Sequence, residues 1–223
     1  MAEALLEARG LDKTYRRGAE RVHALRRVSL ALYPGELVAL VGPSGSGKTS
    51  LLGVLAGWER PDAGELRWAF AAAGAAVIPA WSEVAAVPQA LGLLEDLSVR
   101  ENVALPVRLR LGPARATEGR TEELLGLLGL AELADRAPSE TSLGQQQRAA
   151  VARALVLGPQ LVLADEPSAH QDAAWVHDVF SALRQVVHDR GAACLVATHD
   201  REALRFADRV LRLVDGELEE RTA

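Results

Sequence analysis

A glycine-rich segment that ends in lysine and threonine is the part of this sequence best suited to hold phosphate groups. It runs from Gly42 to Thr49 and matches the pattern G-x-x-x-x-G-K-[ST], between an apolar run and a helix-forming stretch. Glycines let successive backbone N–H groups turn toward phosphate oxygens, and a helix that begins at the lysine adds the positive end of its dipole. The residues expected to bind nucleotide here are Gly42, Pro43, Ser44, Gly45, Ser46, Gly47, Lys48, Thr49 and Ser50.

Two residues of this segment have individual chemistry. Lys48 is expected to reach the β- and γ-phosphates of ATP, and the Thr49 hydroxyl is expected to bind Mg²⁺. Lys48 is the more noticeable because Lys13 is the only other lysine in the chain. The alternative is a purely structural turn rich in glycine and serine. The order of strand, loop and helix favours phosphate binding over that alternative.

A second candidate is a pair of acids that follows the apolar run Leu161 to Ala164. A strand that ends in Asp165 places this carboxylate at the carboxyl edge of the sheet, where open α/β folds bind ligands, so Asp165 is a candidate for supporting Mg²⁺. Glu166 comes next, before Pro167, and could orient or deprotonate an attacking water. Taken alone, such a pair often caps a helix. Together with the phosphate loop it indicates nucleotide hydrolysis.

Four further short motifs occur in a fixed order around these two. They are Gln89 after Val87-Pro88, the segment from Thr141 to Arg148, the segment from Ser168 to Asp172, and Thr198-His199-Asp200. In this order the motifs resemble those of the ABC transporter ATPase family, and the resemblance covers essentially the whole chain. Each motif is weakly specific alone, but their joint order is highly specific.

The resemblance implies roles for single residues. Tyr15 is similar to the aromatic residue that stacks on adenine, although by itself a tyrosine is more often a packing residue. Gln89 is similar to the glutamine that senses Mg²⁺ and the attacking water and couples them to a membrane partner. His199 is similar to the switch histidine that contacts the γ-phosphate, whereas a lone histidine after a strand is usually structural.

The segment with Ser142, Gly144 and Gln145 resembles the signature motif of the family. That motif acts in trans, because it closes over ATP held by the phosphate loop of a second ATPase subunit. A helix N-terminus with a serine hydroxyl offers suitable donors for the γ-phosphate. Asp172 resembles the acid that links the two ATP sites. The implied partners are therefore a second ATPase subunit, in a homodimer or a heterodimer, and an integral-membrane permease.

Two positions depart from the family pattern. Leu143 stands where the signature usually has glycine, and a β-carbon restricts the approach of backbone to phosphate and disfavours positive φ. Gln171 stands where leucine is usual. The first departure suggests slowed hydrolysis or one half of an unequal pair. Because Lys48, Asp165 and Glu166 are intact, we nevertheless expect an active ATPase with ATP and Mg²⁺ as its cofactors.

Composition narrows the remaining function classes. The 223 residues carry a net charge of -5, so no nucleic acid is expected as a partner, although Arg108 and Arg110 form one basic spot. Cys194 is the only cysteine, which fits a reducing compartment. No apolar run approaches the ~20 residues that cross a bilayer, and no secretory signal is recognised. The expected location is the cytoplasmic face of the cell membrane, through the permease.

The expected fold is α/β, a P-loop NTPase core of the ABC-ATPase type with an antiparallel β subdomain and an inserted helical subdomain. One ATPase domain is predicted over 1–223, with residues 1–88 and 159–223 forming the core and 89–158 the helical part that carries the signature. Expected strands cover 5–15, 29–32, 37–41, 62–68, 161–164 and 193–198, with a hairpin at 210–214 and 217–220. Residues 69–80 are left unassigned.

Helices are expected from Lys48 to a stop near Gly57, and over 121–130, 145–157 and 172–190. Ser98 is predicted to cap a further helix through Val99 to Val107, which Pro106 should bend or end.

The type of transporter is indicated by the segment from Leu97 to Val103, which is followed by Leu105-Pro106. It is similar to the branch that serves macrolide export and lipoprotein release, and this favours an exporter-like system. The transported substrate cannot be read from the chain. Two alternatives stay open: a non-transport ABC-type ATPase in DNA maintenance, and a catalytically weakened partner in an unequal heterodimer. No heptad run of the long coiled coil usual in DNA-maintenance relatives is recognised.

Overall fold

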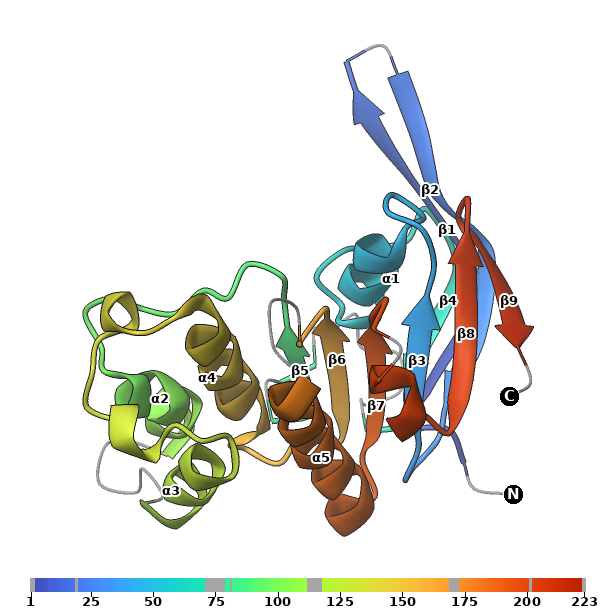
Figure 1. Ribbon diagram of the computed structural model, residues 1–223. Coiled ribbons are helices and arrows are strands. Elements are labelled where there is room, and N and C mark those ends of the chain that lie inside the picture. The colour runs from blue at the N-terminus through green and yellow to red at the C-terminus, as the bar shows by residue number, and fades with distance from the viewer. Residues whose placement is uncertain are drawn as a thin grey trace.

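The computed structural model describes residues 3–18, 20–70, 79–80, 82–111, 118–168, 173–200 and 202–221. Two β-sheets lie on one side of this part of the chain and a block of helices lies on the other (Figure 1). The predicted α/β fold with an antiparallel β portion and a helical portion is confirmed.

The smaller sheet is antiparallel, with the strand order β2-β1-β4. Its strands are β1 (Leu6–Arg17), β2 (Glu20–Leu32) and β4 (Ala63–Trp68), and β4 is an edge strand. β2 begins nine residues earlier than the predicted strand at 29–32. Arg27 has φ +50 at a register shift, so Arg26 and Arg27 are both exposed between buried Leu25 and Val28. This irregularity hides the alternation that a regular strand shows in sequence.

The larger sheet has the strand order β5-β6-β7-β3-β8-β9. All its pairs are parallel except the terminal hairpin of β8 with β9. The strands are β3 (Leu37–Val41), β5 (Val84–Val87), β6 (Leu161–Asp165), β7 (Ala193–Ala197), β8 (Arg209–Val214) and β9 (Glu217–Arg221). The strands predicted in these regions are confirmed to within about one residue at each end, apart from β5, which sequence reasoning had not assigned.

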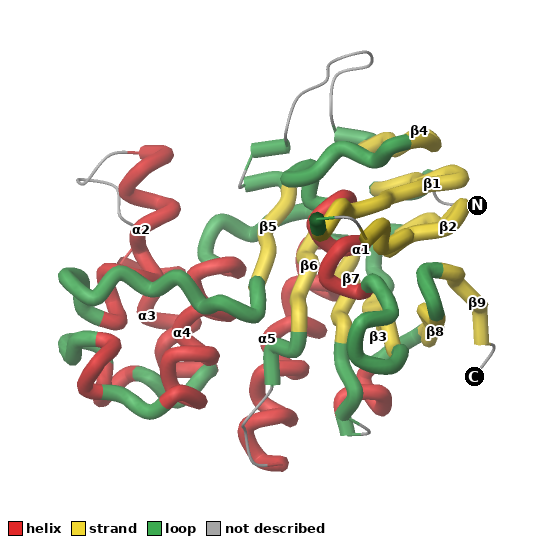
Figure 2. Tube along the Cα trace, turned by 90° about the horizontal axis from the view of Figure 1, so that it is seen from above, coloured by secondary structure: helices red, strands yellow, loops and turns green. Residues whose placement is uncertain are grey.

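Helices cover both faces of the central sheet. Seen from above, α1 (Lys48–Leu55) lies between the two sheets, and α5 (Ala173–Arg190) lies on the opposite face (Figure 2). The buried strands serve both sides because alternate residues face opposite ways: Leu163 joins the core with α1, and Val162 joins the core with α5. Apolar residues on both faces explain why these strands read as continuous hydrophobic runs.

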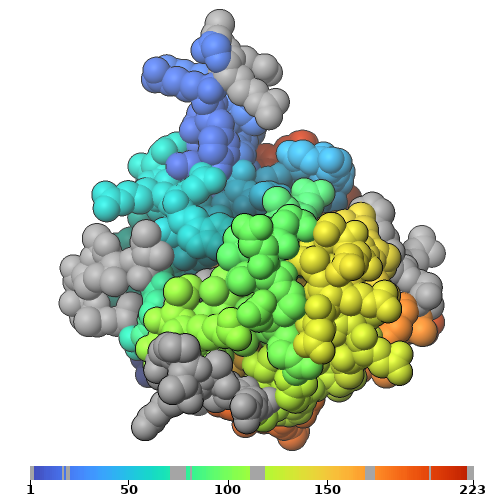
Figure 3. Space-filling view, turned by 90° about the vertical axis from the view of Figure 1, so that its left-hand side faces the viewer, coloured from blue at the N-terminus to red at the C-terminus, as the bar shows by residue number. Residues whose placement is uncertain are grey.

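The helical block comprises α2 (Val99–Leu111), α3 (Glu118–Leu127) and α4 (Leu143–Leu155), with short 3-10 turns at Ala131–Leu133 and Pro138–Glu140; another turn, Ala203–Phe206, follows β7. Figure 3 views the block from outside, with the β1–β2 hairpin projecting above it. Ser98 caps α2 as predicted, since its hydroxyl accepts the Glu101 N–H at 3.2 Å. The prediction that Pro106 could end this helix is wrong, because α2 continues to Leu111. Val103 and Val107, on either side of the proline, are both buried in the core and hold the helix in place.

Among the helices of the described ranges, none combines the length and the apolar character that crossing a membrane requires.

Candidate nucleotide-binding and catalytic site

The predicted phosphate loop and acidic pair meet at one edge of the central sheet. β6, β7 and β3 are neighbours and run parallel, so the segments after their carboxyl ends come together. These segments carry Asp165 and Glu166 after β6, His199 after β7, and the loop from Gly42 after β3. The same edge is where α1 begins (Figure 1). This is the position at which open parallel sheets bind ligands.

The loop between β3 and α1 is shaped by two glycines with no room for a side chain. A β-carbon on Gly42 would lie 2.1 Å from the Leu213 carbonyl oxygen, and one on Gly47 would lie 2.3 Å from that of Ala24. Gly47 also has φ +105, a conformation that side chains rarely adopt. The loop is tied to the β8–β9 hairpin, because the Gly216 N–H donates to the Ser46 carbonyl at 3.2 Å.

Positive groups converge where this loop enters α1. The helix has Gly47 at its N-cap with no side-chain cap, so its first N–H groups are free of a capping acceptor from a side chain. The Lys48 ammonium lies over the same loop and donates to the carbonyls of Gly42 at 2.9 Å and Pro43 at 3.1 Å. Uncapped N–H groups beside a lysine fit the phosphates of a nucleotide.

The predicted magnesium ligands are also in contact. The Thr49 hydroxyl donates to the Asp165 carboxylate at 2.7 Å, and Asp165 is only 7% exposed. Within the described ranges no cluster of three or more His, Cys, Asp or Glu could cage a metal. A hydroxyl and one carboxylate nevertheless fit Mg²⁺, which takes few protein ligands and completes its shell with phosphates and water.

Glu166 is held in an unusual backbone conformation. Its φ is +51, while its N–H donates to the Ala197 carbonyl at 2.9 Å. Its carbonyl accepts the side-chain amide of Gln147 on α4 at 2.7 Å. One carboxylate oxygen lies 2.9 Å from Nδ1 of His199, a residue whose side chain is 80% exposed. Glu166, predicted to act on the attacking water, and His199, predicted to contact the γ-phosphate, are therefore in direct contact.

Gln89 and Tyr15 lie at the margins of this site. Gln89 is exposed shortly after β5, and Val87 pairs with Ala164, so Gln89 follows the same sheet edge as Asp165. Tyr15 on β1 donates its hydroxyl to the Glu59 carboxylate, and the Lys13 ammonium lies 5.4 Å from its ring centroid. Partial burial, followed by the bond to Glu59, raises the pKa of Tyr15, which keeps the phenol protonated.

The signature segment forms a capped helix start. Ser142 is the N-cap of α4: its hydroxyl accepts the Gln145 N–H at 3.3 Å, and the Gln145 side chain accepts the Ser142 N–H at 2.8 Å. The non-glycine residues with positive φ in the described chain are Arg27, Glu166 and Asp215, so Leu143 carries no such strain. Leu143 is 52% exposed at the helix start.

The signature helix and the phosphate loop are not brought together within one chain. In the ribbon and tube views α4 and α1 are separated across β5 and β6 (Figures 1 and 2). Gly144 is the second residue of α4, beside the capping pair. Asp172 and Gln171 lie outside the described residues.

The contact of Gln147 with Glu166 was not predicted from the sequence. Gln147 follows the signature as one of three successive glutamines, Gln145 to Gln147, and only the fold shows that the third reaches Glu166. Gln147 is 6% exposed, unusually buried for a polar residue outside the predicted site. No local sequence signal distinguishes it from its neighbours.

The loop, the acidic pair and the adjoining histidine define a P-loop nucleotide-hydrolysing protein. The sequence matches the family model described as ABC transporter over residues 25–169. It is 42% identical to the lipoprotein-releasing system ATP-binding protein LolD 2 of Caulobacter vibrioides, with 98% of each chain covered. It is 43% identical to LolD of Maricaulis maris, over 98% of this chain and 97% of that one.

Solved structures give the same result. A dimeric post-hydrolysis structure of the ATP-binding cassette MJ0796, bound to ADP and Pi, is similar with a TM-score of 0.87 and 31% identity, covering 98% of this chain and 99% of that one. A second dimeric MJ0796 structure has a TM-score of 0.83 with the same coverage. The chain belongs to the ABC transporter ATP-binding family, and it is an ATPase subunit of such a transporter.

Proposed function

We propose that this subunit hydrolyses ATP to drive a separate integral-membrane permease that releases lipoproteins from the membrane, an exporter-like activity. The observation that carries the enzymatic part is the contact of Thr49 with Asp165 and of Glu166 with His199 at one sheet edge. The choice of lipoprotein release is supported by relatives at about 40% identity that are named as ATP-binding proteins of lipoprotein-releasing systems. Binding through the permease gives the chain a peripheral position on the membrane.

The phosphate loop is assigned to ATP. Lys48 neutralises the β- and γ-phosphates, and the first N–H groups of α1 donate hydrogen bonds to the phosphate oxygens. Thr49 and Asp165, with Gln89 as a further candidate, would hold Mg²⁺, which would stabilise the charge that develops on the phosphates. Tyr15 provides an aromatic face for adenine.

Hydrolysis is assigned to Glu166 together with His199 and Gln89. The Glu166 carboxylate accepts or orients the proton of the attacking water, and His199, which contacts this carboxylate, is assigned to the γ-phosphate. Its 80% exposure leaves the His199 ring open toward a bound nucleotide. Gln89 at the end of β5 completes the water site.

A second ATPase subunit completes each ATP site. Ser142, Gly144 and Gln145 lie at the start of α4, which is separated from α1 in its own chain, and the similar MJ0796 structures are dimers. In a head-to-tail pair the start of α4 meets the ATP of the partner, with Asp172 at the contact. Residues 89–158 are assigned to the helical part and residues 1–88 with 159–223 to the core.

We assign the binding site for the permease to an apolar pocket next to Gln89. The pocket encloses about 340 Å³, and Trp58 on its rim is 59% exposed. Its position beside the segment that follows β5 lets an apolar segment of the permease sense Gln89. The lining residues are Ala56, Trp58, Pro79, Val84, Ala86, Pro88 and Arg153.

The test is capture of the permease. Tagged Glu166→Gln protein with ATP is incubated with detergent-solubilised membranes of the source cells, and captured proteins are identified by mass spectrometry. Recovery of a polytopic permease together with stalled lipoprotein supports the proposal. A Trp58→Asp variant, which places a charge in the pocket, should lose the permease while retaining ATP binding. Capture of a permease without lipoprotein would contradict lipoprotein as the transported substrate. Capture of DNA-associated proteins alone would contradict a role in transport.

A further inference from the structure

Glu166 stays in its left-handed backbone conformation because two neighbours hold it. A non-glycine residue at φ +51 is strained and persists where its surroundings fix it. On one side the N–H of Glu166 bonds to the end of β7, 2.9 Å from the Ala197 oxygen. On the other side the carbonyl accepts the Gln147 amide at 2.7 Å. Gln147 is the only one of these partners that lies on α4.

The helix that supplies this bond is itself firmly seated. Arg148 on α4 stacks its guanidinium over the Trp175 ring of α5, 3.6 Å from the ring centroid. Arg153, further along α4, donates to the Gly92 carbonyl at 2.6 Å and to that of Leu91. Since α4 is anchored on several sides, the Gln147 amide has a fixed position relative to Glu166.

The same helix starts with Ser142, the residue proposed to meet ATP held by the partner subunit. We infer that Gln147 is a positioning residue for hydrolysis: its amide fixes the Glu166 backbone, aims the carboxylate at the attacking water, and transmits displacement of the α4 N-terminus to it. One helix then joins both ATP sites of the dimer. The inference rests on the role proposed above for Glu166.

Two substitutions with side chains about as long as glutamine remove the amide donor of Gln147. Gln147→Met deletes the amide, and Gln147→Glu keeps the shape but places a carboxylate oxygen against the Glu166 carbonyl. We expect turnover to fall roughly 10- to 100-fold, as misplacement of a catalytic group does, with the KM and Kd for ATP little changed. The matched control is Thr121→Val, a buried polar residue of α3, 3% exposed, which should keep normal turnover. If Gln147→Met does not fold, the Gln147→Glu variant carries the same test.

A double variant separates positioning from general stability. If Gln147 acts through the Glu166 carboxylate, adding Gln147→Met to Glu166→Gln lowers the residual turnover no further. An equal loss in both backgrounds, or normal turnover of the single Gln147 variants, overturns the inference. Normal turnover of Glu166→Gln alone overturns the proposed role of Glu166 and the inference with it, and is recognised independently of any Gln147 variant.

Discussion

Thr49 and Asp165 lie 116 residues apart in the chain, yet the threonine hydroxyl donates to the aspartate carboxylate at 2.7 Å. The bond joins the first turn of α1 to the end of β6, the two elements that carry the phosphate loop and the acidic pair. Both oxygens are ligands that Mg²⁺ accepts, and this contact is the basis for proposing the pair as its protein ligands.

Removing the hydroxyl tests this arrangement. Thr49→Val keeps the shape of the side chain but deletes the oxygen, so we expect Mg²⁺-dependent ATP hydrolysis to fall at least ~10²-fold, the range seen when one positioned catalytic interaction is lost. Nucleotide without Mg²⁺ should bind as tightly as to the parent protein. The measurement is turnover against Mg²⁺ concentration. Unchanged Mg²⁺ dependence would contradict the assignment, and Thr49→Ser, which keeps the hydroxyl, should restore activity.

The glycine at the entry of α1 is expected to be irreplaceable. Gly47→Ala combines φ +105 with a β-carbon 2.3 Å from the Ala24 carbonyl oxygen, so we expect destabilisation of more than ~1 kcal/mol. That corresponds to a fall in Tm of at least ~2 °C for a chain of this size. The control is Gly126→Ala in α3, where a β-carbon meets nothing within 4 Å and should stabilise or have no effect. Equal Tm changes in the two variants would argue against the role of Gly47.

Leu143 is predicted not to impair the enzyme. It occupies a helical position at the start of α4, is 52% exposed and has no positive φ. We therefore expect the Leu143→Gly reversion to bring no gain in turnover, and to lower stability slightly because glycine is the poorer helix former. The assay is steady-state ATPase activity of both proteins with the same nucleotide. A large gain would show instead that the leucine obstructs the approach to the ATP of the partner.

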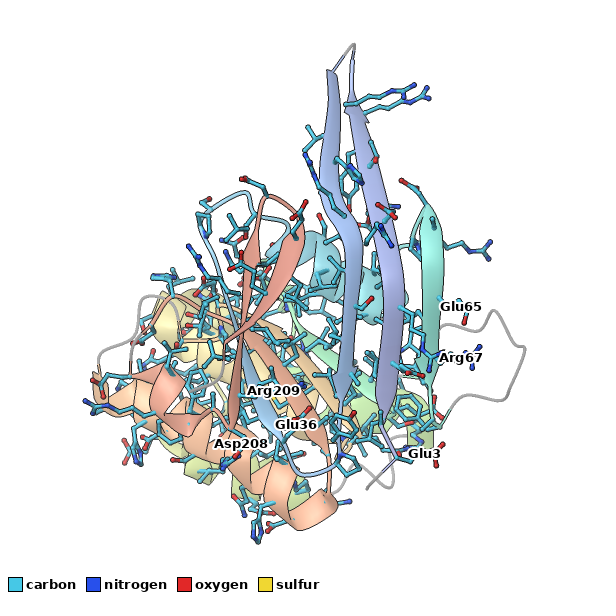
Figure 4. All side chains as sticks on the ribbon, turned by 90° about the vertical axis from the view of Figure 1, so that its right-hand side faces the viewer. Glu3, Glu36, Glu65, Arg67, Asp208 and Arg209 are labelled. Carbon is cyan, nitrogen blue, oxygen red and sulfur yellow. The ribbon has the colours of Figure 1, made fainter. Side chains whose placement is uncertain are left out.

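Acid stability depends in part on Asp208. Its carboxylate accepts the Leu37 N–H at 2.8 Å and bonds to Arg184, and the arginine is the main cause that holds the pKa of Asp208 below its ordinary value. Figure 4 shows Asp208 with Glu36 and Arg209 at one end of the central sheet. A carboxyl with a lowered folded pKa stabilises the protein above its unfolded pKa, about 3.9, and loses that contribution as the pH falls through the folded value.

The corresponding variant is Asp208→Asn. It should reduce stability at neutral pH and should flatten the loss of stability below about pH 4, because the titrating group is gone. Urea unfolding at several pH values measures this. The effect should be modest, since 38% of the Asp208 side chain is exposed to solvent. Asp135→Asn, with a side chain 88% exposed, is the control and should leave the curve unchanged. Identical acid limbs for all three proteins would contradict the contribution of Asp208.

The sequence predicts those parts of the fold that follow from local pattern. The strand Leu37–Val41 and the hairpin around Asp215-Gly216 were predictable because continuous apolar runs and a turn dipeptide define them without reference to distant residues. The full extent of β2 was not predictable, because the irregular Arg27 breaks its alternation. The candidate site residues were predicted from motif order, whereas the bond from Gln147 to Glu166 depends on how α4 packs and leaves no pattern in the chain.

The central claim is that Glu166 acts on the attacking water. Its most direct test is the rate of ATP hydrolysis by the Glu166→Gln protein, measured beside the parent protein at the same concentrations of ATP and Mg²⁺. The substitution keeps the shape of the side chain and removes only its capacity to take a proton from water. We expect turnover to fall by roughly 10²–10⁴-fold while the Kd for ATP stays nearly the same. Turnover equal to that of the parent would contradict the assignment of Glu166 as the residue that acts on the attacking water.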